Sequence, residues 1–439
     1  MLNESRLRVA ITRYDGASGA VAKAIELIDG LKRINKNDNV LIKPNVLWGA
    51  GGSKHIPRYG FITTSRVVEE IVITLREMGC RKISIGEGCT ANRELGSDTL
   101  KGFAWSGLAR VAKQYDVKLI DFNANPYVDA KVDGHSVEIA RAALEADFIV
   151  DVPVLKTHSM TRVSLGMKNL KGCLSMRSKK KFHKVNLNEM IAFLNTVIRP
   201  GLTVIDGIYA MEGGPTHMGR AHRMNLIVAG TDPLSADMVG ASILGIEPKT
   251  VGYMRRFAEI SERSIEMDSI EVAGEKIEEV CKRLDWRLDY HSVFQAAGIE
   301  GITMQFPGEG FCTNCVTCAD ALIGCYCKDN PGTSLEGVEL CFGPEVKAKK
   351  DSKKVILIGD CALRANKGDV GAVRVGGCPP KVASAYASVV MNTLPPNRAK
   401  MVLSVRLAKG ILNKLGVYNE RFPREFSYDL PEFDPRHFA

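Results

Sequence analysis

VLIKPNVL (40–47), TTSRVVEEIVITLREMGC (63–80) and KISIGEG (82–88) follow one another in the chain and decide the fold class. The first and third segments are rich in Val, Ile and Leu and end in polar residues, which is typical of buried strands. The middle segment carries apolar residues at helical spacing, with Ser and Thr in front and Gly79 at its end as cap signals. This order predicts an α/β fold: a mostly parallel sheet with helices on both faces.

The same alternation continues to about residue 233. Further strand signatures lie at 117–123, 146–158, 202–213 and 225–233, with helical patterns such as 102–115 between them. In such a sheet the ligand usually lies beyond the carboxyl ends of the strands. The polar residues that follow each strand therefore form the candidate binding site.

These strand ends, and the segment after Lys156, are rich in lysine, amide and imidazole groups. Ammonium groups bind carboxylate or phosphate, and a neutral imidazole can move a proton. The expected substrate-binding residues are Lys43, Asn45, Lys168, Asn169, Lys171, Asp206 and Asp232. The expected catalytic residues are His158, Lys156 and His183.

Each of these residues also has a simpler interpretation. A single lysine at a strand end is often a solvated surface residue. RSKKKFHK (177–184) has the composition of a solvated mobile loop, although a lid over an anionic substrate would have the same composition. Only the joint position of several lysines at strand ends favours a binding site.

Twelve cysteines occur in the chain, and seven of them lie in one arrangement in the C-terminal third, whereas the other five are scattered singly. FCTNCVTCADALIGCYC (311–327) precedes two predicted strands, KKVILIGDC and GAVRVGGCPP, which contain the last two of the seven. A cysteine-rich loop and two strand ends can bring four thiolates to one [4Fe–4S] cluster. The preferred ligands are Cys312, Cys315, Cys361 and Cys378, with Cys318 as the substitute. A zinc site with four thiolates uses the same spacing and remains an alternative.

The length of 439 residues predicts two or three domains. We expect an anion-binding α/β domain at 1–300, including a connector at 262–300, a cysteine-rich α/β metal domain at 301–395, and a basic helix with an extended tail at 396–439. The net charge of +9 favours anionic ligands. The absence of a long apolar run predicts a cytoplasmic protein without a membrane span.

Four segments carry a family resemblance: LIKPNV, DVPVLKTHSMTRVSLGMKNLKGCL, VIDGIYAMEGGP and TDPLSAD. In this order they resemble the family catalogued as domain of unknown function 362, described as uncharacterised iron–sulfur centre proteins, over about residues 5–260. The resemblance implies an α/β core with cluster-binding cysteines on its C-terminal side. It also implies that the pocket contains Lys43, Asn45, Lys156, His158, Lys168, Asn169, Lys171, Asp206 and Asp232. The cysteine spacing departs from the repeated ferredoxin pattern C-x2-C-x2-C-x3-C-P.

The leading functional hypothesis is an iron–sulfur oxidoreductase or accessory redox enzyme. Its C-terminal cluster would pass electrons from a redox partner protein to an anionic substrate or cofactor at the strand ends, and His158 or His183 would donate a proton. The chain is a possible homo-oligomer. A non-catalytic electron-transfer or cofactor-delivery protein is the second hypothesis. The third is a zinc-stabilised protein that binds nucleic acid, against which the lack of aromatic residues among the basic ones argues.

Overall fold

The computed structural model describes residues 7–16, 19–47, 58–90, 98–214, 219–307, 313–368, 371–414 and 433–438. The chain divides into two compact units. The first consists of Met1–Gly214, Arg220–Trp286 and Tyr428–Ala439, and the second of Pro215–Gly219 and Arg287–Ser427. The expected boundary at residue 300 therefore falls inside the second unit, because Tyr290 and Phe294 belong to the hydrophobic core of that unit.

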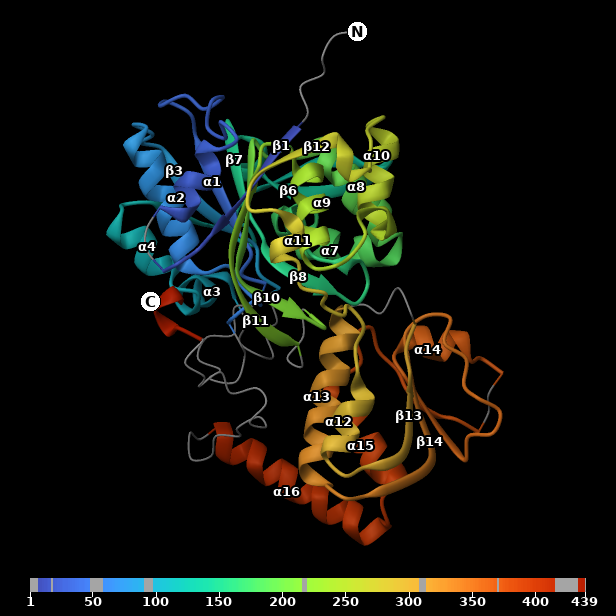
Figure 1. Ribbon diagram of the computed structural model, residues 1–439. Coiled ribbons are helices and arrows are strands. Elements are labelled where there is room, and N and C mark those ends of the chain that lie inside the picture. The colour runs from blue at the N-terminus through green and yellow to red at the C-terminus, as the bar shows by residue number, and fades with distance from the viewer. Residues whose placement is uncertain are drawn as a thin grey trace. The chain divides into compact units, whose positions relative to one another are not determined.

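A mostly parallel sheet of ten strands forms the centre of the first unit, which confirms the predicted α/β fold class (Figure 1). The strand order is β12-β1-β11-β10-β7-β2-β3-β4, and β8, which pairs with β9, extends from β10. The strands are β1 (Leu7–Arg13), β2 (Val40–Pro44), β3 (Ile83–Glu87), β4 (Lys118–Asp121), β7 (Phe148–Val152), β8 (Val154–His158), β9 (Arg162–Val163), β10 (Leu202–Glu212), β11 (Arg220–Gly230) and β12 (Ile270–Gly274). A separate hairpin contains β5 (Tyr127–Val132) and β6 (His135–Ala140).

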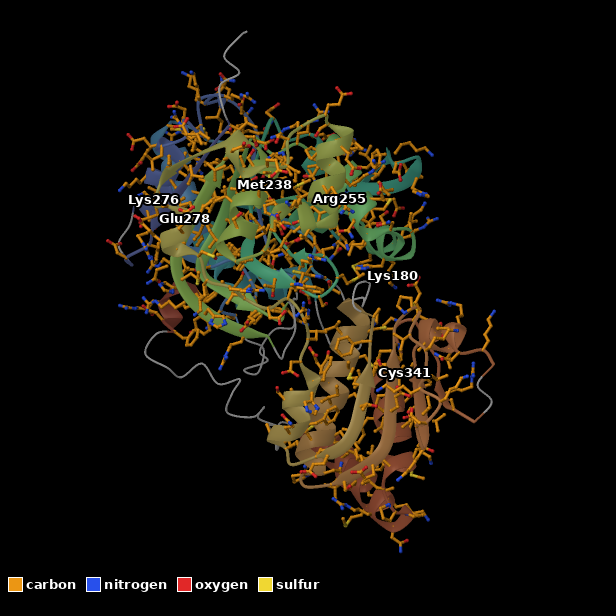
Figure 2. All side chains as sticks on the ribbon, turned by 45° about the vertical axis from the view of Figure 1, so that its right-hand side comes forward. Lys180, Met238, Arg255, Lys276, Glu278 and Cys341 are labelled. Carbon is orange, nitrogen blue, oxygen red and sulfur yellow. The ribbon has the colours of Figure 1, made fainter. Side chains whose placement is uncertain are left out.

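Helices cover both faces of this sheet (Figure 1). The α-helices are α1 (Ala20–Glu26), α2 (Ser65–Glu77), α3 (Thr99–Trp105), α4 (Leu108–Gln114), α5 (Arg141–Leu144), α6 (Gly166–Asn169), α7 (Met176–Lys184), α8 (Leu187–Val197), α9 (Pro233–Ile243), α10 (Gly252–Ile260) and α11 (Ile277–Val280). Short 3₁₀ helices are η2 (Leu170–Cys173), η3 (Pro248–Thr250), η4 (Met267–Ser269) and η6 (Pro435–Phe438). Helices α1 and α2 lie on one face, and α8, α9 and α10 on the other. Met238 of α9 is buried, whereas Arg255 of α10 is exposed (Figure 2).

Two segments of the first unit differ from their predicted form. The strand expected at 146–158 is two strands, because Pro153 lies between β7 and β8 and has no N–H for a sheet hydrogen bond. RSKKKFHK is part of helix α7 and not a loop. Ser175 caps this helix by accepting a hydrogen bond from the Ser178 N–H, and Phe182 is fully buried, so the helix is anchored despite its basic composition.

The second unit contains a parallel four-stranded sheet in the order β13-β14-β15-β16. Its strands are β13 (Glu300–Gln305), β14 (Ser334–Phe342), β15 (Lys354–Ile358) and β16 (Val373–Val375). Its helices are α12 (Tyr290–Ala296), α13 (Thr313–Asp329), α14 (Asp360–Ala365), α15 (Val382–Thr393) and α16 (Pro396–Lys414). Cys341 is buried on the inner strand β14 (Figure 2). No helix in the described part of the chain is long and apolar enough to cross a membrane.

The cysteine region differs from its predicted form in three places. The segment expected to be a loop is helical from Thr313 onward, so Cys315 and Cys318 lie in the first two turns of α13. Strand β15 ends at Ile358, and Cys361 lies in the first turn of α14. Strand β16 ends three residues before Cys378. The chain therefore turns at Gly359 and again after β16 before it reaches each cysteine.

The last described residues, 433–438, pack on the first unit, where a tail that wraps a surface was expected. Phe433 and Phe438 are buried, and both rings contact the Tyr59 ring. The Asp434 N–H donates to the Tyr209 hydroxyl at 3.0 Å. This short segment is thus part of the hydrophobic core that also contains α2.

Replacing Phe433 with Ala should lower the free energy of unfolding of the first unit by about 3 kcal/mol, because a buried phenyl ring is lost. Phe433 is 6% exposed, whereas Met401 on α16 is 60% exposed. Met401→Ala is therefore the matched control, and it should change stability by less than about 0.5 kcal/mol. Urea denaturation of both full-length variants measures the difference. Equal stability of the two variants would contradict this packing.

Candidate functional site

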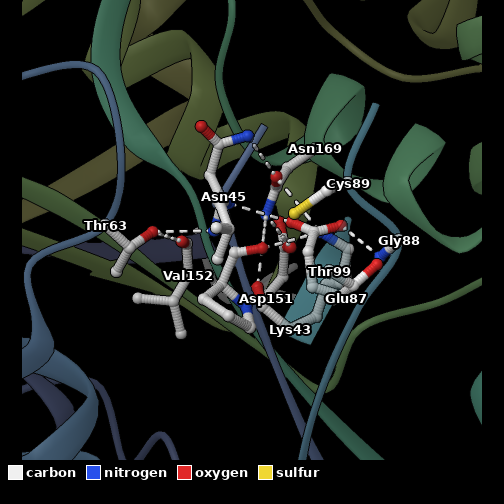
Figure 3. A network of polar contacts seen from close by, with 12 residues as sticks. Lys43, Asn45, Thr63, Glu87, Gly88, Cys89, Thr99, Asp151, Val152 and Asn169 are labelled. Carbon is white, nitrogen blue, oxygen red and sulfur yellow. Dashed lines mark hydrogen bonds and ion pairs between the residues drawn. The ribbon is translucent and has the colours of Figure 1, made fainter. Parts of the chain in front are cut away.

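A buried ion pair joins the ends of two neighbouring strands. The Lys43 Nζ of β2 lies 3.0 Å from the Glu87 Oε2 of β3, and both side chains are almost completely buried (Figure 3). Glu87 also accepts hydrogen bonds from the N–H groups of Val46 at 3.0 Å and Gly88 at 2.7 Å. Burial acts to lower the pKa of Lys43, but Glu87, Cys173 and Asp151 together outweigh it, and the pKa lies above its ordinary value. Lys43 is therefore a cation with a resident counter-ion.

Two asparagines extend this network between elements (Figure 3). The Asn169 amide of α6 donates to Asp151 Oδ1 at 2.8 Å, and its oxygen accepts from the Asn45 side chain at 3.0 Å. The Asn45 backbone N–H donates to Thr63 Oγ1 at 2.7 Å. Burial holds the pKa of Asp151 well above its usual value. The predicted residues Lys43, Asn45 and Asn169 thus meet at one point.

Gly172 covers the ion pair so closely that no side chain fits there. A Cβ on Gly172 would lie 2.3 Å from Glu87 Oε1 and 2.6 Å from Lys43 Nζ. Because contacts under 3.0 Å force one partner to move, a side chain at this position would displace the buried ion pair. Because Gly172 belongs to η2, its close approach also fixes the position of Lys171, the preceding residue.

Lys156 is the second buried lysine, and its contacts are neutral. Its Nζ donates to Asn45 Oδ1 at 2.5 Å and to the Phe61 carbonyl at 2.9 Å. Burial lowers the pKa of Lys156 to about 7. The ammonium group is thus connected to the Lys43 network through an amide and not through a carboxylate.

His158 is two residues further along β8 and is 1% exposed. Its Nδ1 accepts a hydrogen bond from the Met160 N–H at 3.0 Å, whereas its buried Nε2 has no partner among the described residues. Burial, followed by the nearby positive charges of Lys168 and Lys171, holds the pKa of His158 well below its usual value. The ring is therefore neutral and carries its proton on Nε2.

His183 of α7 completes a group of basic side chains. Its Nε2 lies 3.0 Å from Lys171 Nζ, and its buried Nδ1 has no partner among the described residues. Lys168 Nζ donates to Ser164 Oγ at 3.2 Å. Burial, together with Lys171 and Lys156, holds the pKa of Lys168 well below its usual value. Burial, followed by the positive charges of Lys171 and Lys168, holds the pKa of His183 well below its usual value. The structure brings these predicted residues together.

The two predicted aspartates have other contacts. Asp206 accepts hydrogen bonds from the N–H groups of Thr64 at 2.7 Å and Ile208 at 3.1 Å, and burial raises its pKa to about 6. It lies near Lys156 and holds the start of α2. Asp232 caps α9 and forms an ion pair with Arg263.

Asp232 lies apart from the basic group because of the direction of β11. This strand runs antiparallel to β10, so its last residue, Gly230, pairs with Thr203 near the start of β10. Lys156 pairs with Met211 near the other end of β10. A carboxyl end on an antiparallel strand does not contribute to the same edge of the sheet.

Sequence reasoning missed four residues of the site: Glu87, Asp151, Thr63 and Lys179. Glu87 could have been found, since it follows a buried strand directly. Asp151 lies inside an apolar strand, and Thr63 is distant in sequence from its partners, so neither gave a signal. The Lys179 side chain donates to the Gly88 carbonyl from helix α7, which was expected to be a loop.

Three predicted cluster ligands belong to segments that meet in the second unit. A Cβ on Gly359 would lie 3.9 Å from Cys315 Sγ and 3.7 Å from the Gly377 carbonyl oxygen. Gly359 precedes Cys361 by two residues, and Gly377 precedes Cys378 directly. The Gly359 N–H donates to the Val375 carbonyl at 2.8 Å, which holds the two turns together.

The remaining predicted ligands are Cys312 and Cys318. Cys312 lies outside the described residues. Cys318 is buried in the core, where burial and then Asp320 raise its pKa to about 12, so it remains a thiol unless a metal binds it. In the part of the chain that the structure describes, no three or more His, Cys, Asp or Glu side chains are arranged to hold a metal ion.

A family model and one relative agree with the sequence resemblance. The chain is 27% identical over 228 residues to the thylakoid-associated protein sll1697 of Synechocystis sp., a match that covers 50% of this chain and 67% of that protein. The lactate racemase apoprotein from Thermoanaerobacterium thermosaccharolyticum aligns over 85% of this chain and 89% of its own with a TM-score of 0.38 and 12% identity. The family model for the Domain of unknown function (DUF362) matches residues 40–242, which include every predicted residue of the basic site. Over these residues the chain is similar to that family.

Proposed function

We propose that this protein is an iron–sulfur oxidoreductase, or an accessory redox enzyme, whose first unit binds an anionic substrate or cofactor. The anion site is inferred from one observation: the contacts described for Lys156 and Lys168 contain no carboxylate. Uncompensated buried cations are costly, and such perturbed groups gather at functional sites. A bound anion would supply the missing negative charge.

The residues of the site have distinct roles in this proposal. Lys156, Lys168 and Lys171 bind the anion, while the neutral rings of His158 and His183 offer N–H donors to it. Lys156, with a pKa of about 7, is suited to give or take a proton near neutral pH. Lys43 is paired with Glu87, so it holds the framework and does not bind the ligand.

The redox part of the proposal rests on the cysteines. Cys315, Cys361 and Cys378 come from segments that meet, and Cys312 would be the fourth ligand of a [4Fe–4S] cluster, which exchanges single electrons. The electrons would come from a redox partner protein. This chemistry favours a cytoplasmic location, where thiolates are kept reduced.

Cys378→Ala should remove most of the iron and acid-labile sulfide from anaerobically purified protein, because one of four ligands is lost. Cys281 is exposed and lies in the first unit, so Cys281→Ala is the matched control and should keep the full iron content. Iron and sulfide assays with the visible absorption spectrum measure both variants. Stoichiometric zinc without iron in the parent protein would contradict the redox role and favour the zinc alternative.

Sulfate should bind more tightly as the pH falls through about 7. Sulfate remains a dianion between pH 5 and 9, so the pH dependence reports the protein's own groups. Lys156 has a pKa of about 7, is neutral above it and cationic below it, and one linked proton changes the affinity by up to about tenfold per pH unit. Calorimetric titration at pH 6, 7 and 8 checks this. An affinity that increases with pH would contradict the role of Lys156.

A further inference from the structure

Two imidazole rings in the basic group present N–H donors that have no described acceptor. Because the Nδ1 of His158 accepts from the Met160 N–H, the proton of the neutral ring must be on Nε2. An ammonium group can only donate, so the Nε2 of His183 accepts from Lys171 and the proton of that ring is on Nδ1. Both of these N–H groups are buried and lack a partner among the described residues.

The lysines add further donors. Lys168 uses one of its three ammonium hydrogens on Ser164, and Lys156 uses two on Asn45 and Phe61. A buried donor without an acceptor costs about 1–3 kcal/mol. Several such donors in one place indicate that the acceptor is a ligand and not part of the chain.

The acidic groups nearest to these donors are already engaged. Glu87 is bound by Lys43 and by two backbone N–H groups, and Asp206 is bound by the N–H groups of Thr64 and Ile208. The pKa values of His158, Lys168 and His183 are lowered by burial and by positive neighbours alone. The contacts described for Lys156 and Lys168 are neutral groups, so a bound anion would supply the acceptor that these donors lack.

The donors also come from four different elements. His158 and Lys156 extend from β8, Lys168 and Lys171 from α6 and η2, and His183 from α7. A carboxylate offers two oxygens in one plane and a single charge. A phosphate or sulfate group offers up to four oxygens in tetrahedral directions and close to two charges, which suits donors that approach from several sides.

We infer that the ligand of the first unit carries a tetrahedral dianion, a phosphate or sulfate group, bound by Lys156, Lys168, Lys171 and the N–H groups of His158 and His183. This inference rests on the proposed anion site and makes its ligand class specific. The group is either a free oxyanion or part of a larger phosphorylated or sulfated molecule.

Titration calorimetry of the full-length protein at pH 6.5 with sulfate, phosphate, methyl phosphate, acetate and malonate tests the ligand class. Sulfate, phosphate and methyl phosphate should each bind at least tenfold more tightly than acetate and than the dicarboxylate malonate. If methyl phosphate binds as tightly as phosphate, the site accepts an ester; if only the free ions bind, it takes a free oxyanion. Carboxylates that bind as tightly as sulfate would overturn this inference and leave the anion site standing. No binding of any anion would overturn both.

Lys168→Met tests the site without relying on loss of binding alone. It should weaken sulfate binding about tenfold or more, because a charge-assisted hydrogen bond is lost. In the absence of anion its Tm should rise, because a repelled cation has been removed. Lys249 is exposed and pairs with Glu247, so Lys249→Met is the matched control and should change sulfate affinity less than twofold. A lower Tm with an unchanged sulfate affinity would contradict the proposal.

Discussion

Lys43 and Glu87 form the ion pair on which the geometry of the site depends. They end two adjacent parallel strands, and each charge tolerates burial because the other lies 3.0 Å away. The pair sets the path of the chain above it, since Gly172 lies directly over both side chains. The Asn169 side chain belongs to the same network, because it accepts a hydrogen bond from Lys43 and donates one to Asp151. The segment that carries the remaining basic residues is therefore held in place by a neutralised pair.

The contacts described for Lys156 and Lys168, by contrast, are with neutral groups. Burial lowers the pKa of Lys156, and burial together with neighbouring lysines lowers the pKa values of Lys168, His158 and His183. This arrangement lowers the stability of the ligand-free protein, as is common where function requires a strained site. The protein thus combines a lysine paired with a carboxylate, Lys43, with Lys156 and Lys168, whose described contacts contain no carboxylate.

The sequence predicted the parts of the site that follow simple strand geometry. Lys43, Asn45 and Lys156 come directly after or at the end of buried strands, and their joint position was expected from the parallel sheet. Asn169, Lys171 and His183 were also predicted as site residues, but the close approach of Gly172 to Lys43 and Glu87 is a contact that no periodicity reveals. Asp232 was placed in the pocket because β11 resembles its parallel neighbours in composition, although it runs in the opposite direction. Strand direction is set by connections and not by local sequence.

The fold of the cysteine region was predicted less well for a similar reason. Runs of β-branched residues correctly predicted β15 and β16, but they do not indicate where a strand stops. Gly359 has a φ of +91°, which ends β15 before the first turn of α14 and carries Cys361 onto a helix. The segments that carry Cys361 and Cys378 still meet, because the turn at Gly359 and the turn at Gly377 are hydrogen-bonded together.

Nitrogen-15 NMR of labelled histidine tests the central claim most directly, because it reports which ring nitrogen carries the proton. At pH 7 without anion, the account predicts that His158 is neutral with its proton on Nε2 and His183 is neutral with its proton on Nδ1. Addition of sulfate should shift both of these N–H signals as they become hydrogen-bonded. Doubly protonated rings before the addition would contradict this account, and so would N–H signals that do not move when sulfate is added. In either case the two histidines would not offer buried N–H donors to an anion.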